Sequence, residues 1–189
     1  MNISNEEKRI LLRLARNSIK SLFQKIDPSE IAVEDHPILN THKGAFVTLT
    51  IDNRLRGCIG YIISDLPLHQ TVGDAAVQAA IGDPRFSKLT LDEFNLISIE
   101  VSILSEPFPM HNYDEIVLGK HGLILSEGGQ RGLLLPQVPI EHRMNKEEYL
   151  SALCQKAGSN HDLWREQILN IEMFTAEVFS EKEFKFGSN

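Results

Sequence analysis

A cysteine lying between two glycines on a short predicted strand is the residue of this sequence best suited to chemistry. Residues 55–60 read Leu-Arg-Gly-Cys-Ile-Gly. Because side chains alternate along a strand, Arg56, Cys58 and Gly60 are expected on one face. A cation at that spacing favours the thiolate, which is the nucleophilic form of cysteine. Glycines 57 and 60 would let a ligand or a second strand come close to the sulfur.

The alternative for Cys58 is a purely structural role. Free cysteine is among the most buried residue types, and it fills small spaces in tight sheet contacts. Nucleophilic catalysis needs a base or an orienting cation within hydrogen-bond reach. Arg56 supplies a cation, but a guanidinium cannot accept a proton. Residue types alone leave both interpretations open.

The sequence contains no motif for a phosphate-binding loop or a metal site. Gly128-Gly129 lies in a predicted hairpin turn, and no lysine-containing helix start follows it, so no phosphate-binding glycine loop is expected. The seven histidines are scattered, and the cysteines Cys58 and Cys154 show no paired ligand spacing. We therefore expect neither a metal site nor a bound cofactor.

The elements that must position Cys58 follow from the spacing of apolar residues. Ser4-x-x-Glu7 has the form of a capping box, and an apolar stripe at helical spacing follows over residues 10–23. This pattern predicts a first helix that starts after Ser4, packs on a sheet by its stripe, and ends at Asp27-Pro28.

Strands and helices are interspersed in the rest of the chain. Residues 97–103 alternate strictly and predict a core strand, with Glu100 on the face opposite Ile99 and Val101. Further strands are predicted at 45–51, 55–63, 122–127, 131–135 and 171–179, and helices at 68–81, 145–158 and 163–168. Two of the connections are hairpins. This order predicts an α+β fold with a mostly antiparallel sheet rather than a doubly wound parallel one.

The signature at residues 55–60 resembles that of the AMMECR domain family, whose microbial members are often called AmmeMemoRadiSam system protein A. Further blocks match in the same order, at residues 44–49, 83–86, 99–104, 121–123, 134–138 and 154–164. The resemblance covers roughly residues 10–180. One departure follows Glu141, where the family often carries a tryptophan and this chain has His142-Arg143-Met144. A site wall formed there would differ in shape.

This resemblance implies a fold more readily than a reaction. It implies one α+β domain over residues 1–189, built from two unequal lobes that flank a cleft, with the signature near that cleft. It also implies a Memo-like protein and a radical-SAM protein as partners in a shared pathway. The family's biochemical activity is not defined by the resemblance, and neither is a substrate.

The matching blocks suggest further members of the site. His121 is the preferred candidate base for Cys58, and its alternative role is that of a turn histidine. Arg85 could clamp a carboxylate or phosphate, or form a salt bridge with Asp83. Loop residues after the strand 131–135 could bind a small polar ligand. The predicted site comprises catalytic Cys58 and His121 and substrate-binding Arg56, Gly57, Gly60, Arg85, Gln137 and Glu141.

Charge and hydropathy limit the classes of partner. The net charge is −7, and six basic side chains gather in the first 25 residues against Glu6 and Glu7. Only the first helix could therefore bind the phosphate backbone of a nucleic acid, and nucleic acid is not expected to be the main ligand. No apolar run approaches the roughly 20 residues that span a bilayer. With two lone cysteines and no signal-peptide pattern, we expect a cytoplasmic protein with free thiols.

Two functions from different classes remain. The first is a ligand-binding or catalytic cleft around residues 55–60, in which Cys58 acts on a small polar substrate or on a modified side chain of a partner. The second is an interaction module without turnover, in which the glycine-rich strand serves close packing only. Catalysis requires an accessible Cys58 thiol with a lowered pKa, whereas an interaction module requires neither.

Overall fold

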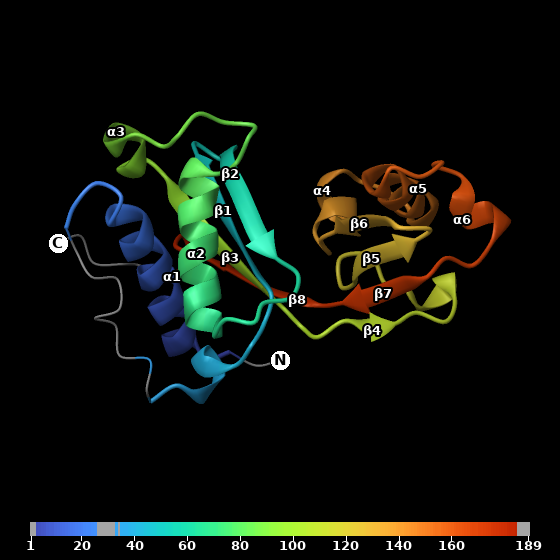
Figure 1. The fold of residues 1–189 in the computed structure, drawn as a ribbon, viewed down its shortest axis with the longest axis horizontal. Coiled ribbons are helices and arrows are strands. Elements are labelled where there is room, and N and C mark those ends of the chain that lie inside the picture. The colour runs from blue at the N-terminus through green and yellow to red at the C-terminus, as the bar shows by residue number, and fades with distance from the viewer. Residues whose placement is uncertain (1–2, 26–32, 34, 185–189) are drawn as a thin grey trace. The chain divides into compact units, whose positions relative to one another are not determined.

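The computed structural model describes residues 3–25, 33 and 35–184 (Figure 1). The chain divides into two compact units. Unit 1 consists of Met1–Leu104 and Glu177–Asn189, and unit 2 of Ser105–Ala176. Unit 2 is thus inserted between the third strand of unit 1 and the last strand of the chain.

Unit 1 is a four-stranded sheet with two long helices along one face (Figure 1). Its strands are β1 (Ala45–Ile51), β2 (Arg54–Tyr61), β3 (Ser98–Leu104) and β8 (Ala176–Ser180), in the order β2-β1-β3-β8. Its helices are α1 (Asn5–Lys20), α2 (Leu68–Ile81) and α3 (Leu91–Phe94), with a 3-10 turn, η2, at Pro37–Asn40. β1 pairs antiparallel with both β2 and β3, and this order makes β2 an edge strand.

The first helix starts where its capping box predicts. The Glu7 amide donates to the Ser4 hydroxyl, and the Ser4 amide donates 2.8 Å to the Glu7 carboxylate. Leu11, Ala15 and Ile19 are fully buried in the core of unit 1, so the predicted stripe does pack inward. The helix ends at Lys20, earlier than the stripe suggests. The predicted stop at residues 27–28 lies outside the described residues.

The second helix and the core strand also follow their patterns. Ala75 and Ala76 of α2 are fully buried, and small side chains at such positions let a helix approach a sheet closely. In β3, Ile99 and Val101 are fully buried, whereas Glu100 between them is half-buried on the opposite face. The strict alternation of residues 97–103 therefore predicts the orientation of this strand correctly.

Unit 2 has its own sheet and its own core. Its strands are β4 (Phe108–Pro109), β5 (Gly122–Glu127), β6 (Gln130–Leu134) and β7 (Ile171–Phe174), in the order β4-β7-β5-β6. Its helical elements are η3 (Tyr113–Glu115), α4 (Val138–Glu141), α5 (Lys146–Ala157) and α6 (Leu163–Glu166). Tyr149 and Cys154 of α5 are fully buried in this core, so Cys154 is structural, as its helical spacing indicates.

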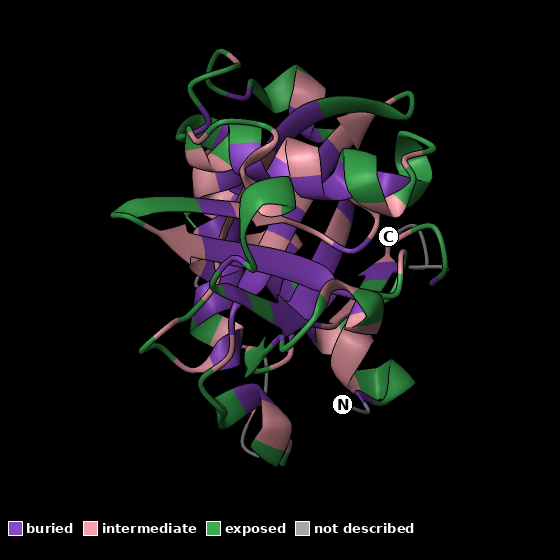
Figure 2. Ribbon diagram, turned by 90° about the vertical axis from the view of Figure 1, so that its right-hand side faces the viewer, coloured by how far each residue is buried: buried purple, intermediate pink, exposed green. Residues whose placement is uncertain are grey.

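One predicted strand is divided between the two sheets. Residues 171–179 read as a single run, but the structure interrupts the run at Thr175, so that β7 pairs in unit 2 and β8 in unit 1. Buried residues run along the strands, while most connecting loops are exposed (Figure 2). The α+β class and the antiparallel pairing are both confirmed. No helix in the described part of the chain is long and apolar enough to cross a membrane.

Candidate functional site

A β-bulge reshapes the signature strand at Arg56. Leu49 of β1 is opposite Gly57, but its neighbour Thr50 is opposite Leu55, so Arg56 is the extra residue of β2. A bulge interrupts the alternation of side chains and re-aims the extra residue. Regular alternation therefore does not apply between Arg56 and Cys58, and the shared face of these two residues stays a prediction.

The Arg56 guanidinium binds a carboxylate of α3 instead of facing the thiol. Its Nε and Nη2 atoms donate to Glu93 at 2.8 and 2.9 Å, and Nη2 also donates 2.9 Å to the Ser87 carbonyl. This pair, together with the Thr90 amide, lowers the pKa of Glu93 to about 2. Arg56 thus anchors the segment after α2, and the orienting cation expected for Cys58 is engaged elsewhere.

The backbone of Cys58 is held by the loop that follows α2. Its amide donates 2.9 Å to Asp83 Oδ2, and its carbonyl accepts from Arg85 Nη2 at 3.3 Å. Arg85 binds the same carboxylate through Nε and Nη2, at 2.9 and 2.7 Å. This bidentate contact and the Cys58 amide hold the pKa of Asp83 well below its usual range. Of the two roles predicted for Arg85, the structure therefore contains the salt bridge with Asp83.

These contacts occupy the outer edge of β2. An edge strand presents unpaired N–H and C=O groups that a second strand could bind. At Cys58, the backbone N–H already donates to the Asp83 carboxylate and the carbonyl already accepts from Arg85, so neither group is left to pair with an added strand. The ion pair therefore blocks strand addition at this position.

The Cys58 thiol lies in a row of polar side chains across three strands. Thr48 is opposite both Cys58 and Glu100 in the strand pairing, and its hydroxyl donates 3.3 Å to the sulfur. Because Val47 and Leu49 are buried in the core beside α1 and α2, this row is on the sheet face turned away from those helices. We call Cys58, Thr48 and Glu100 the polar row.

Burial determines the protonation state of the thiol. It raises the pKa of Cys58, and the nearby Asp83 and Glu100 carboxylates act in the same direction. The Thr48 hydroxyl and Arg85 act in the opposite direction but do not outweigh burial. Cys58 is consequently a neutral thiol near pH 7.

The two signature glycines serve close packing. A Cβ at Gly57 would lie 2.1 Å from the carbonyl oxygen of Ala79 in α2, so only glycine lets this helix approach the strand. A Cβ at Gly60 would lie 2.3 Å from the Ala45 carbonyl oxygen and 2.4 Å from Cγ of Phe46. The space expected for a ligand beside Gly60 is therefore filled by the neighbouring strand, and Gly60→Val should mainly destabilise the fold.

The remaining predicted site residues belong to unit 2. His121 is only 8% exposed, its Nδ1 accepts a 3.3 Å hydrogen bond from the Val117 amide, and burial lowers its pKa. Gln137 precedes α4, and its Oε1 atom is buried with no partner among the described residues. Glu141 is exposed at the end of α4. Arg56, Cys58 and Arg85 are thus together in unit 1, and the shared cleft with the other three stays a prediction.

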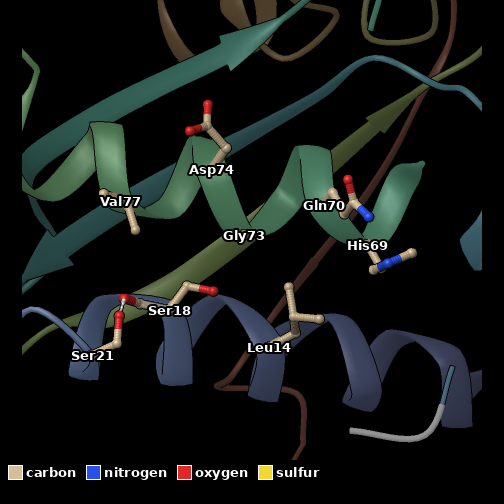
Figure 3. Close-up of a pocket in the computed structure, with 8 residues that line it drawn as sticks. All are labelled: Leu14, Ser18, Ser21, His69, Gln70, Gly73, Asp74 and Val77. Atoms are coloured by element: carbon tan, nitrogen blue, oxygen red, sulfur yellow. Dashed lines mark hydrogen bonds between the residues drawn. The ribbon is translucent and has the colours of Figure 1, made fainter. Parts of the chain in front are cut away.

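A pocket of about 350 Å³ lies along the junction of α1 and α2 in unit 1 (Figure 3). Leu14 and Ser18 extend toward α2, where Gly73 faces them. His69 Nδ1 lies 3.0 Å from the Leu39 carbonyl oxygen, so that nitrogen carries the proton. Sequence reasoning missed this pocket, because its residues come from two helices with no motif in common.

Sequence reasoning also missed several partners of the signature. Thr48 lies in an alternating strand and belongs to no motif, whereas Glu93 could have been noticed from the capping box Thr90-x-x-Glu93.

Both cysteines are free thiols, Cys58 in unit 1 and Cys154 in unit 2. Among the described residues, no group of three or more His, Cys, Asp or Glu side chains is placed to hold a metal ion.

Similar proteins define the family of this chain. Residues 12–179 match the AMMECR1 family. Protein Mbar_A1807 of Methanosarcina barkeri is 40% identical over 189 residues, which cover 96% of this chain and 93% of that protein. Protein MJ0810 of Methanocaldococcus jannaschii is 40% identical over 187 residues, which cover 94% of this chain and 92% of that protein.

A solved structure agrees with this assignment. The uncharacterized protein PH0010 from Pyrococcus horikoshii superposes with a TM-score of 0.85 at 36% identity, and the match covers 94% of this chain and 93% of that one. The sequence match over residues 12–179 and the similarity of the whole fold lead to one conclusion: the chain belongs to the AMMECR1 family.

Proposed function

We propose that this protein is a binding module without turnover, and that the polar row of Cys58, Thr48 and Glu100 lies at the centre of its recognition surface. The observation that carries the proposal is the half-buried Cys58 thiol, which accepts a hydrogen bond from the Thr48 hydroxyl; burial also raises its pKa. A nucleophilic cysteine requires the opposite shift. A neutral thiol beside a hydroxyl and a carboxylate instead offers a small polar surface for recognition.

The surroundings of the thiol support recognition rather than catalysis. Arg56 is bound to Glu93, and Arg85 to Asp83, so both arginines of the predicted site are paired within unit 1. The predicted base His121 belongs to unit 2, where its Nδ1 lone pair is occupied by the Val117 amide. The groups that would activate a thiolate are therefore engaged in structural contacts.

The partner that we propose is a protein. Leu55 is 43% exposed and, by its pairing with Thr50, shares the face of the polar row. Val178 of β8 is 40% exposed, and alternation with the buried Phe179 places it on that face too. Apolar side chains around a polar centre suit a protein surface better than a small ligand. On the family resemblance, the proposed partners are a Memo-like protein and a radical-SAM protein in the cytoplasm.

The state of the thiol can be tested directly. The alkylation rate of Cys58 with iodoacetamide, followed by mass spectrometry from pH 6 to 10, should rise with a midpoint above the ordinary cysteine pKa of about 8.5. Cys154, which is fully buried, provides an internal comparison. A midpoint below pH 7 would contradict the proposal.

Partner binding provides the second test. Purified Memo-like and radical-SAM proteins from the same organism should bind the wild-type chain, and Glu100→Gln should weaken binding roughly tenfold. Cys58→Ser should keep most of the binding, because serine preserves a neutral donor and acceptor at that position. A matched control is Glu166→Gln, which changes an exposed carboxylate of unit 2. Equal losses for both glutamate variants would contradict a role for the polar row.

Thiol-dependent chemistry is the second candidate, and one contact favours it. The Thr48 hydroxyl donates to Cys58 Sγ, and Arg85 also favours the charged form. A substrate that displaced water from the row could strengthen these effects. This alternative predicts that Cys58→Ser abolishes function while leaving the fold and partner binding intact.

A further inference from the structure

The pocket along the junction of α1 and α2 has the volume and the apolar walls of a small-molecule site. Its volume of about 350 Å³ lies within the range of roughly 300–1,000 Å³ that is common for ligand pockets. Leu14 of α1 and Val77 of α2 supply apolar walls, and Gly73 adds a stretch of wall without a side chain (Figure 3). The pocket can therefore hold an apolar body of modest size.

Ser18 of α1 contributes a hydroxyl that lacks a hydrogen-bond partner. The residue lines the pocket and is only 6% exposed, and its hydroxyl has no partner among the described residues. The oxygen is not one of the fully enclosed atoms, so it can be reached from the pocket. In Figure 3 it extends toward Gly73, where a Cβ would lie 3.0 Å from it. A buried hydroxyl without a partner is costly, and in native proteins it usually meets a water or a ligand.

Ser21 lies on the same side of α1, three residues further along, and completes a pair of polar groups. Its hydroxyl donates 2.7 Å to the Ser18 carbonyl, so the Ser21 oxygen can only accept a further hydrogen bond. The two serines therefore offer one hydroxyl donor and one oxygen acceptor. A ligand hydroxyl satisfies both, because it donates and accepts, whereas an ammonium group only donates and a carboxylate only accepts.

The charge of the pocket disfavours an anionic ligand. Asp74 of α2 lines it, and among the described lining residues there is no lysine or arginine. The Tyr61 hydroxyl donates to the Asp74 carboxylate, and this contact raises the pKa of Tyr61 to about 12. Tyr61 thus stays the donor and Asp74 keeps its negative charge.

We infer that this pocket binds a small neutral alcohol, whose hydroxyl accepts from Ser18 and donates to Ser21. The apolar body of the alcohol packs against Leu14, Gly73 and Val77. The inference goes beyond the proposed function, because α1 and α2 cover the sheet face opposite the polar row.

The test is a titration of the whole chain with 2-phenylethanol, followed by NMR through the backbone amides. We expect saturable shifts confined to residues 14–21 and 69–77. Sodium phenylacetate and 2-phenylethylammonium chloride carry the same ring with a charged head group, and each should bind several-fold more weakly. Equal or tighter binding of either charged compound would overturn the alcohol class. Absence of saturable shifts with 2-phenylethanol would overturn the inference and assign the Ser18 hydroxyl to water.

Two variants and a control make the test specific. Ser18→Ala removes the donor and should weaken binding several-fold without lowering the unfolding temperature, because it also removes an unpaired buried hydroxyl. Gly73→Ala places a methyl group 3.0 Å from the Ser18 oxygen and should abolish saturable binding. The control is Ser87→Ala, which changes an exposed serine of unit 1 outside the pocket. If Ser18→Ala and Ser87→Ala bind the alcohol equally well, the pocket is not the site, whether or not Gly73→Ala folds.

Discussion

The backbone amide of Cys58 donates a 2.9 Å hydrogen bond to the carboxylate of Asp83, which lies 25 residues further along the chain. Arg85 binds the same carboxylate and also donates to the Cys58 carbonyl. The signature strand and the loop after α2 are thereby joined at Cys58, in addition to the contact of Arg56 with the Ser87 carbonyl. Residues 55–60 and 83–86, which both match blocks of the family, are therefore in direct contact, and this contact has a structural role of its own.

We expect Asp83→Ala to lower the free energy of unfolding by about 2–4 kcal/mol. The change leaves the Cys58 amide and the Arg85 guanidinium without their shared acceptor, and Asp83 is only 4% exposed. Urea denaturation followed by circular dichroism measures the loss. The matched control is Asp162→Ala, which removes an exposed pair with Arg165 and should cost less than about 1 kcal/mol. Equal losses for the two variants would contradict the role of Asp83.

Acid should destabilise unit 1 through the same carboxylate and through Glu93. Both have folded-state pKa values below those of the unfolded chain. Their contribution to stability is therefore complete above the unfolded pKa values of about 4, and it is lost as pH falls through the folded values. Urea midpoints should fall steadily from pH 5 to pH 2. In Asp83→Asn this fall should be smaller, and an unchanged pH dependence in that variant would exclude Asp83 as a cause.

We expect Gly57→Ala to destabilise the protein by about 3 kcal/mol or more, because the new methyl group would collide with the Ala79 carbonyl of α2. Thermal unfolding measures the effect. The control is Gly128→Ala in the β5–β6 turn, where a Cβ would meet nothing within 4 Å. Its cost should be only about 1 kcal/mol, from a backbone φ of 55°. A Gly57→Ala variant as stable as this control would disprove the close helix approach.

His121 should make unit 2 sensitive to mild acid. Burial lowers its folded-state pKa below the unfolded value of about 6.5. The neutral form is thus favoured by folding, and its contribution is complete above about pH 6.5 and lost as pH falls toward the folded pKa. We expect the free energy of unfolding to fall between pH 7 and pH 5 in the wild type and to fall less in His121→Gln. A His121 NMR titration midpoint at or above 6.5 would contradict this.

The local patterns of the sequence were sufficient for most of the longer helices and strands and for the fold class, whereas the short elements α3, α4 and β4 were not predicted. The capping box at Ser4 and Glu7, the alternation of residues 97–103 and the glycine turn at 128–129 all predict features of the structure correctly. Each of these signals acts between residues at most a few positions apart, where backbone geometry dictates the spacing. The resemblance to the AMMECR family likewise depended on short ordered blocks.

The partners of the signature side chains were decided by tertiary structure. The extra residue at Arg56 arises from the pairing of β1 with β2. The Arg56–Glu93 ion pair and the hydrogen bond from the Cys58 amide to Asp83 depend on how α3 and the loop after α2 pack against β2. No local spacing encodes these contacts. The pKa of Cys58 was decided in the same way, since burial is a property of the packed unit. Sequence therefore identified the residues, and packing determined whether their charges were available for chemistry.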